Sequence, residues 1–241
     1  MINNVRRTVL AILNKSNYGY ISPDDFNNYA RVAQLEVFEN YVHQFNKENN
    51  KINSRMAGSG HADNRARYNG ELDKFIALDN PTSATGDNAF TLPSLSTNGD
   101  DIFKIVSVST AAAEAQKVSN TEFRRLNMSD LTAPALWSPI YTVNGNTLTM
   151  GAGNATAYTD AEVNIEYLRY PRIPNWTYMS LGGGEPLFDA TANDFQDFEV
   201  GIAEETELIN KILQMAGMSI REIQSVQAAS TEEVERKTEQ K

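Results

Sequence analysis

Cysteine is absent from the 241 residues of this chain, and histidine occurs only twice. Without a thiol, the protein can form no disulfide, no thiolate nucleophile and no cysteine-bound zinc or iron–sulfur centre. His43 and His61 are too few for a histidine-rich metal site and leave little scope for histidine acid–base chemistry. We therefore expect no catalytic residues, no metal and no cofactor, and we interpret the chain as a protein that is not an enzyme.

Long apolar runs are also missing. No stretch reaches the roughly 18 to 20 apolar residues that a membrane helix needs. The residues after Met1 follow an amphipathic pattern that is unlike a signal peptide. Hydrophobic residues make up 41% of the chain, which is enough for a folded core. The sequence thus predicts a folded protein that is made in the cytoplasm and contacts no membrane.

Positive charge is scarce. The chain has 21 Lys and Arg residues against 31 Asp and Glu residues, a net charge of -10. Residues 1–80 carry 10 basic and 9 acidic side chains, whereas residues 81–241 carry 11 and 22. A protein that grips nucleic acid over a broad face should be basic. The acidic balance therefore indicates a surface along which DNA slides freely. It argues against a surface that binds DNA tightly.

Apolar residues at helical spacing predict helices near the N-terminus. A first apolar stripe covers residues 2–13 in steps of three and four. Ser22 and Pro23 then form a strong helix start, because serine caps free amides and proline suits the first helical position. The stripe of the second helix continues for about five turns. Residues 46–69 are polar and indicate a mobile loop or a frayed helix end, and a short helix is expected over 71–78.

The middle of the chain has the alternating pattern of strands. Residues 102–108 form a β-branched run, with Ile102, Lys104, Val106 and Val108 on one face. The pair Asn144-Gly145, between two apolar runs, is typical of a tight hairpin. Residues 163–169 alternate in the same way, and 120–128 could form a short helix.

The last third returns to a helical pattern. An apolar stripe from Leu208 to Met215 ends at Gly217, a residue type common just past a helix end. A weaker helical pattern covers 220–229, and 230–241 has too little apolar content to fold in isolation.

These patterns predict an α+β fold, in which the N- and C-terminal segments form a helical bundle around an inserted strand-rich β domain. The expected parts are residues 1–80 (helical), 81–180 (β-rich insert), 181–229 (helical return to the bundle) and 230–241 (flexible tail).

Several segments resemble a known family in the same order along the chain. These are Asn17–Asn27 leading into Ala33–Glu39, then Pro134–Tyr141, Glu166–Trp176 and Phe195–Gly217. Together they are similar to virion structural proteins of podovirus-type phages, especially crAss-like phages of Bacteroidota.

The resemblance implies a head–tail connector, a neck ring or adaptor between portal and tail. It implies a ring of copies, dodecameric in that family, that contacts the portal protein and neighbouring tail ring proteins. Double-stranded DNA would pass through the ring without sequence-specific binding, and the protein would reside in the virion after synthesis in the host cytoplasm. The resemblance carries over no catalytic residues. A tail-tube, collar or capsid auxiliary protein remains the alternative within the virion.

Two groups of residues are candidates for contacts. A local excess of positive charge could touch DNA or an acidic neighbouring ring, or could be a solvated loop; it comprises Lys47, Lys51, Arg55, Arg65 and Arg67. Apolar residues at helical spacing near the C-terminus could form an assembly arm that folds on a neighbour, or a frayed end; they are Ile220, Ile223 and Val226.

Acidic residues gather between Glu185 and Glu207, with no basic residue before Lys211. They could line a DNA channel, meet a basic partner or form a solvated helix entry. A glycan-cleaving tail enzyme is a distant alternative, because it needs two positioned carboxylates in an aromatic-lined cleft. Trp137 and Trp176 are the only tryptophans, and both lie in proline-rich segments.

Overall fold

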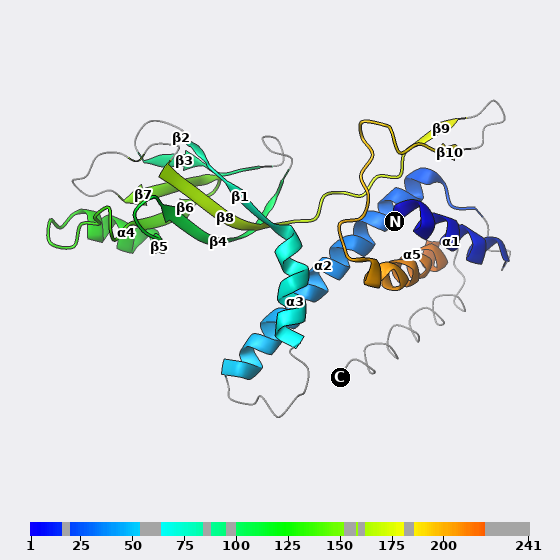
Figure 1. The fold of residues 1–241 in the computed structure, drawn as a ribbon, viewed down its shortest axis with the longest axis horizontal. Coiled ribbons are helices and arrows are strands. Elements are labelled where there is room, and N and C mark those ends of the chain that lie inside the picture. Colours follow the sequence, from blue (N-terminus) through cyan, green and yellow to red (C-terminus); the bar gives the residue numbers. More distant parts are fainter. Residues whose placement is uncertain are drawn as a thin grey trace. The chain divides into compact units, whose positions relative to one another are not determined.

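The structure, a computed structural model of the chain, describes residues 1–15, 20–53, 64–83, 88–94, 100–151, 158, 162–180 and 186–219. These residues form a helical unit, from the described parts of 1–74 and 171–241, and a β unit, from the described parts of 75–170 (Figure 1). Helices and antiparallel sheets both occur, which confirms the α+β class.

The boundaries of the β unit differ from the expected 81 and 180. Strand β1 (Ile76–Asp79) pairs with β8 (Val163–Arg169), so the β unit begins before residue 81, where a helix had been expected. On the return, β9 (Tyr178–Ser180) pairs with β10 (Pro186–Phe188) inside the helical unit. The pairing of β1 with β8, far apart in the sequence, sets the first boundary and is not revealed by local pattern, whereas β9 and β10 form a local ribbon.

The helical unit contains the elements α1 (Ile2–Lys15), α2 (Pro23–Asn53), α3 (Asn64–Leu72), η1 (Asp73–Phe75), η3 (Ile202–Glu204) and α5 (Glu205–Ser219). Helix α5 packs against α1 and α2, and α3 packs against α2. The predicted apolar stripes face this core, with buried side chains at Ile2, Val5, Val9, Leu13, Phe26, Ala30, Ala33, Val37, Leu208 and Ile212.

The start of α2 follows the predicted capping. The Ser22 hydroxyl accepts the Asp25 amide at 3.1 Å and donates to the Asp25 carboxylate at 2.7 Å. The helix then continues to Asn53, so of the two alternatives for residues 46–53 the mobile loop is wrong and the continuation as a helix end holds. Helix α5 likewise passes Gly217 and ends at Ser219. Packing of α3 on α2 gives the polar end of α2 a tertiary support that its sequence does not show.

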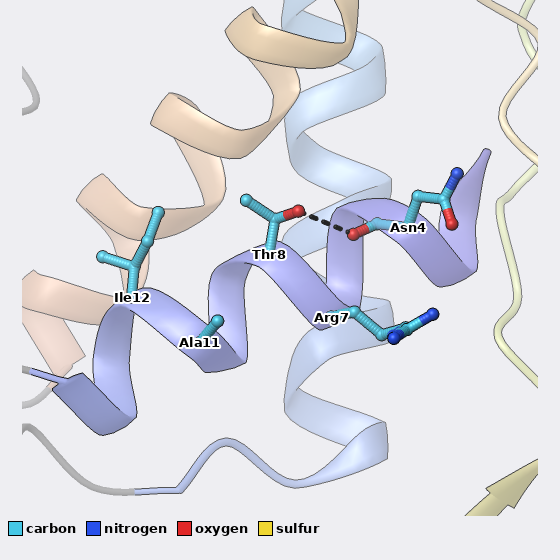
Figure 2. A pocket seen from close by; sticks show the side chains of 5 residues that line it. All are labelled: Asn4, Arg7, Thr8, Ala11 and Ile12. Carbon is cyan, nitrogen blue, oxygen red and sulfur yellow. Dashed lines mark hydrogen bonds between the residues drawn. The ribbon is translucent and has the colours of Figure 1, made fainter.

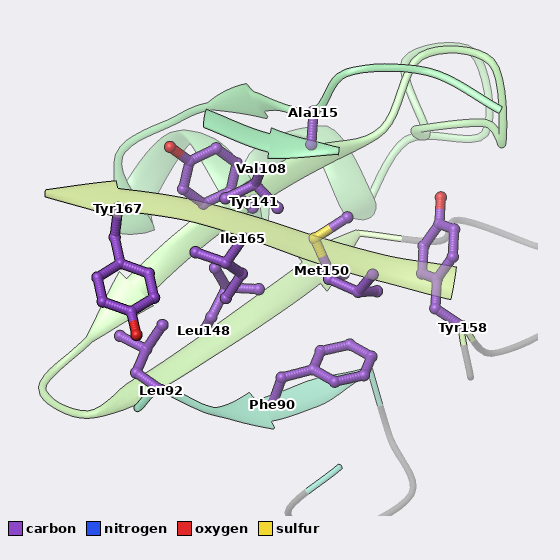
Figure 3. Close-up of a cluster of buried hydrophobic side chains, with 11 residues drawn as sticks. Phe90, Leu92, Val108, Ala115, Tyr141, Leu148, Met150, Tyr158, Ile165 and Tyr167 are labelled. Atoms are coloured by element: carbon purple, nitrogen blue, oxygen red, sulfur yellow. The ribbon is translucent and has the colours of Figure 1, made fainter. Parts of the chain in front are cut away.

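The β unit is built from two sheets that share one core. One sheet has the order β1-β8-β4, and the other β2-β3-β7-β6-β5. The other elements of the β unit are the strands β2 (Thr82–Ser83), β3 (Ala89–Thr91), β4 (Ile102–Thr110), β5 (Gln116–Lys117), β6 (Ile140–Asn144) and β7 (Thr147–Gly151), and the helix α4 (Asn120–Asn127). Buried side chains from both sheets meet between them, including Phe90, Val108, Tyr141, Leu148, Ile165 and Tyr167 (Figure 3).

Strand β4 departs from the predicted alternation. Its register against β8 shifts between Ile102 and Lys104 and again between Ile105 and Ser107, as β-bulges do. Consequently Ile102, Ile105 and Val108 pack on the core at a spacing of three, whereas Val106 is exposed. The prediction that Lys104, Val106 and Val108 lie on one face of the strand is therefore wrong.

The predicted hairpin is confirmed as β6 and β7, with a shift of one residue in its turn. Asn144 pairs with Thr147, so the two turn residues are Gly145 and Asn146. Gly145 has a φ of +59°, and Asn146 does not have a positive φ. A positive φ at only the first turn position is the pattern of a type II′ turn, which favours glycine there.

Candidate functional site

The described residues contain no group of three or more His, Asp and Glu side chains placed to hold a metal ion. His43 is exposed on α2, whereas His61 lies outside the described residues. Among the described helices, none has the length and apolar content needed to cross a membrane.

The basic candidates are only partly placed. Lys47 is exposed on α2, and Arg67 is exposed on α3 with its guanidinium 5.9 Å from the ring centroid of Tyr68. Lys51 lies one helical turn after Lys47 in α2. Arg65 lies near the start of α3, and Arg55 falls outside the described residues. Because α3 packs on α2, the two helices that supply these cations are neighbours.

The assembly-arm candidates Ile220, Ile223 and Val226 all lie outside the described residues. Their expected role stays a prediction, as does the flexible tail at 230–241.

Part of the acidic run is buried in the helical unit. Glu204 and Glu207 are buried, so the alternatives of a channel lining and of a solvated helix entry do not hold for these two residues. Lys211 is also buried, 2.8 Å from a carboxylate oxygen of Glu36 and 3.9 Å from one of Glu207. Breaking a buried pair leaves a charge uncompensated, so these groups act on stability.

Tyr41 lies among these carboxylates and is itself buried. Burial of the hydroxyl raises the pKa of Tyr41 far above its usual value, and the negative charges of Glu204 and Glu71 raise this pKa further. The phenol therefore stays protonated at any physiological pH. A group in this state is a poor general base, so the cluster suits a structural role better than catalysis.

Trp176 forms the centre of the helical unit's polar and aromatic packing. Its ring lies 3.8 Å from the guanidinium carbon of Arg6, and it stacks on Tyr178 at 5.6 Å and on Phe188 at 5.8 Å between centroids. The Trp176 amide donates to Asn27 at 2.9 Å, and Asn27 donates back to the Trp176 carbonyl at 3.2 Å. The segment around Trp176 is thereby fixed to α1 and α2. The sequence offered no signal for this role beyond the rarity of tryptophan.

Asp197 caps the N-terminus of α1. Its carboxylate accepts the Met1 ammonium and the Ile2 amide, each at 2.7 Å, and the Phe198 amide at 2.8 Å. Burial raises the pKa of Asp197, but these hydrogen bonds and the ammonium charge outweigh burial, so the pKa lies below its usual 3.8. Anions are stabilised at helix N-termini, which accounts for an acid at this position.

The segment between α4 and β6 exposes large apolar side chains. Within residues 128–137, here called the 128–137 loop, Met128 is 87% exposed, Leu131 94% and Trp137 80%. Exposed apolar side chains that gather in one place are a common mark of an interaction site, and these three lie close together in the sequence.

The 128–137 loop has a defined shape. The Thr132 amide donates to the Ser129 carbonyl at 3.1 Å, and the Ser138 amide donates to the Ala135 carbonyl at 2.9 Å. Pro134 is buried against β7 at Gly151, where a Cβ would lie 2.9 Å from the proline ring and 2.8 Å from Ile140. Glycine at this position therefore lets the base of the loop approach the strand.

The helical unit has a groove along the outer face of α1. The groove has a volume of about 480 Å³ and is lined by Asn4, Arg7, Thr8, Ala11 and Ile12. Figure 2 shows these side chains on α1, with α5 and α2 behind the helix. The Thr8 hydroxyl donates to the Asn4 carbonyl at 3.0 Å, so the threonine presents its methyl group to the groove. The α1 groove, as it is called below, thus combines apolar groups with one arginine.

The β9–β10 ribbon exposes a second apolar surface on the same unit. Tyr178 pairs with Phe188, and both stack on Trp176. Met179 pairs with Leu187 on the opposite face, and both are about half exposed. This surface is small because the ribbon consists of two strands of three residues each.

No protein-family model matches the chain, and a comparison with curated proteins finds no match either.

Proposed function

We propose that this protein is a structural subunit of a phage head–tail connector, a neck ring or adaptor that docks between portal and tail around the DNA channel. The ordered sequence resemblance gives the class of protein. The observation that carries the proposal is the 128–137 loop, because an ordered loop with exposed Met128, Leu131 and Trp137 is built for contact with another protein.

Ring assembly needs two different surfaces on every copy. A head-to-tail interface joins one surface to another, and it closes into a ring when the rotation between copies permits. The β unit offers the 128–137 loop, and the helical unit offers the α1 groove and the β9–β10 ribbon. The portal protein and the adjoining tail rings would occupy surfaces that remain after the copies have joined.

The proposed relation to DNA is passage without sequence-specific binding. The net charge of -10 disfavours tight non-specific contact with the phosphate backbone, which supports passage over clamping. Lys47 and Arg67, the members of the local basic group with exposed side chains in the structure, could approach DNA or an acidic ring.

Two measurements test the proposal. Native mass spectrometry of the full chain, alone and with purified portal protein, should give a closed oligomer, for which the resemblance suggests twelve copies. Cryo-EM of the intact particle should place that oligomer at the portal–tail junction. A position along the tail tube, at a collar or on the capsid surface would select the alternative virion roles. Hydrolysis of host glycans by the purified chain, abolished by one Asp or Glu substitution, would contradict a purely structural role.

A further inference from the structure

The 128–137 loop concentrates exposed apolar surface in one place. Three of the four most exposed large apolar side chains of the described residues are in this loop: Leu131, Met128 and Trp137. Hydrogen bonds within the loop and the buried Pro134 hold it in shape. A preorganised apolar knob loses little conformational freedom on binding, so its burial favours association.

The α1 groove has the size to receive such a knob. Its volume of about 480 Å³ is open to solvent, which leaves room for an indole ring to lie along it. The apolar groups of Thr8, Ala11 and Ile12 line it, and Ile12 is 41% exposed. Covering this face would remove apolar surface from water on both partners.

The charges of the two surfaces also match. Arg7 is exposed beside the α1 groove, and Asp130 is exposed between Met128 and Leu131 in the loop. Arginine also stacks favourably on an indole ring. The preceding residue of α1 already does this, since Arg6 lies 3.8 Å from the Trp176 ring centroid. Trp, Arg and a rim charge are the components of an interface hot spot.

We propose that the 128–137 loop of one copy docks in the α1 groove of a second copy, with Trp137 as its anchor. The inference rests on the proposed ring function, which requires each copy to contact another through unlike surfaces. Loop and groove are such a pair, so the contact is head-to-tail and repeats from copy to copy. The partner is therefore this same chain, and the contact is apolar at its centre with Arg7 and Asp130 at its rim.

Two variants test the head-to-tail geometry. Trp137→Asp disables the loop and leaves the groove, and Ile12→Asp disables the groove and leaves the loop. By sedimentation velocity, each variant alone should associate at least about thirtyfold more weakly than the wild-type chain, as a hot-spot residue does. An equimolar mixture should form a one-to-one dimer and nothing larger, because it contains a single intact pair of surfaces. The matched control Leu187→Asp, on the β9–β10 ribbon, should associate like the wild-type chain.

Disulfide cross-linking tests the contact directly, since the chain has no cysteine of its own. Copies with Ser138→Cys and copies with Ala11→Cys are mixed at high concentration under mild oxidation, and a cross-linked dimer is expected. As a control, copies with Leu78→Cys, an exposed site elsewhere on the β unit, are mixed with the Ala11→Cys copies. This mixture should give no cross-linked dimer. No dimer from the first pair overturns the proposal. Cross-linking of Ala11→Cys to Ile223→Cys in its place would assign the α1 groove to the C-terminal tail and overturn it as well.

The outcomes separate the docking from the connector function. Rings that assemble equally well with Trp137→Asp and Ile12→Asp would overturn the docking and leave the function intact. A chain that forms the Ser138–Ala11 cross-link but lies away from the portal–tail junction in cryo-EM would support the docking and overturn the function.

Discussion

Replacing each of the two tryptophans by alanine should separate a structural tryptophan from a contact tryptophan. Trp176 is 2% exposed and stacks against Arg6, Tyr178 and Phe188, whereas Trp137 is 80% exposed. Truncating a buried aromatic residue to alanine costs about 3–5 kcal/mol. Trp176→Ala should lie at the upper end, about 4–5 kcal/mol, because it also removes the stacking partner of a buried guanidinium. Trp137→Ala should change the free energy of unfolding by no more than about 0.5 kcal/mol.

Urea unfolding followed by the helical circular dichroism signal provides the assay, since the long helices belong to the unit that contains Trp176. The slope of the free energy of unfolding against urea concentration should not change. A shift in the midpoint then reports a change in stability alone. In thermal unfolding, Trp176→Ala should lower the melting temperature by roughly 10–20 °C. Trp176→Phe keeps the stacking and loses the 3.2 Å hydrogen bond from Nε1 to Asn3, so it should cost about 1–2 kcal/mol. Equal losses from Trp176→Ala and Trp137→Ala would refute the reasoning.

Three further predictions follow from the described contacts. Because the pKa of Asp197 is lowered in the folded chain, its stabilisation is complete above pH 3.8 and is lost as the pH falls through the lower folded pKa; acid unfolding should therefore be less steep for Asp197→Asn than for the wild-type chain. Gly151→Ala should destabilise the β unit by about 1–3 kcal/mol, because its Cβ would lie 2.8 and 2.9 Å from neighbouring side chains. The control Gly70→Ala, whose Cβ meets nothing within 4 Å in α3, should stabilise by about 0.5–1 kcal/mol in the same thermal scan. Under the passage model, filter binding at physiological salt should find equally weak DNA affinity for the wild-type chain and for Lys47→Glu with Arg67→Glu; a salt-dependent affinity lost in the variant would instead assign these cations to DNA.

Local signals predicted the starts and faces of the main elements. Ser22 and Pro23 specify the start of α2 because capping depends on a few adjacent residues. The alternation over 163–169 predicted β8 because its buried residues recur at every second position. The α+β class followed from such periods, since each reports a face that must be covered.

Tertiary context decided the features that the sequence did not predict. The two bulges in β4 change the core spacing from two to three, and they appear only when β8 is laid beside the strand. The extension of α2 through residue 53 accompanies the packing of α3. The 128–137 loop was visible in the sequence as a proline-rich stretch with Trp137, but its exposure depends on how Pro134 packs against Gly151.

Some acids of the helical unit serve as acceptors for the backbone of irregular segments. Residues 171–177 and 189–199 lack a long helix or strand, so their backbone groups need partners from elsewhere. Gln34 supplies two of them, accepting from the Glu199 amide and donating to the Arg172 carbonyl, and the Glu199 carboxylate accepts the Arg172 amide.

Regular elements satisfy their backbone groups locally, which is why a sequence pattern predicts them. An irregular segment is satisfied by side chains far along the chain, such as Gln34, which lies 165 residues from Glu199. An acid in such a segment can serve as an internal acceptor, as Asp197 does for the first amides of α1. The buried Glu204 and Glu207 therefore add little negative charge to the surface, and in the proposed connector the repulsion of DNA would come from exposed acids such as Asp194.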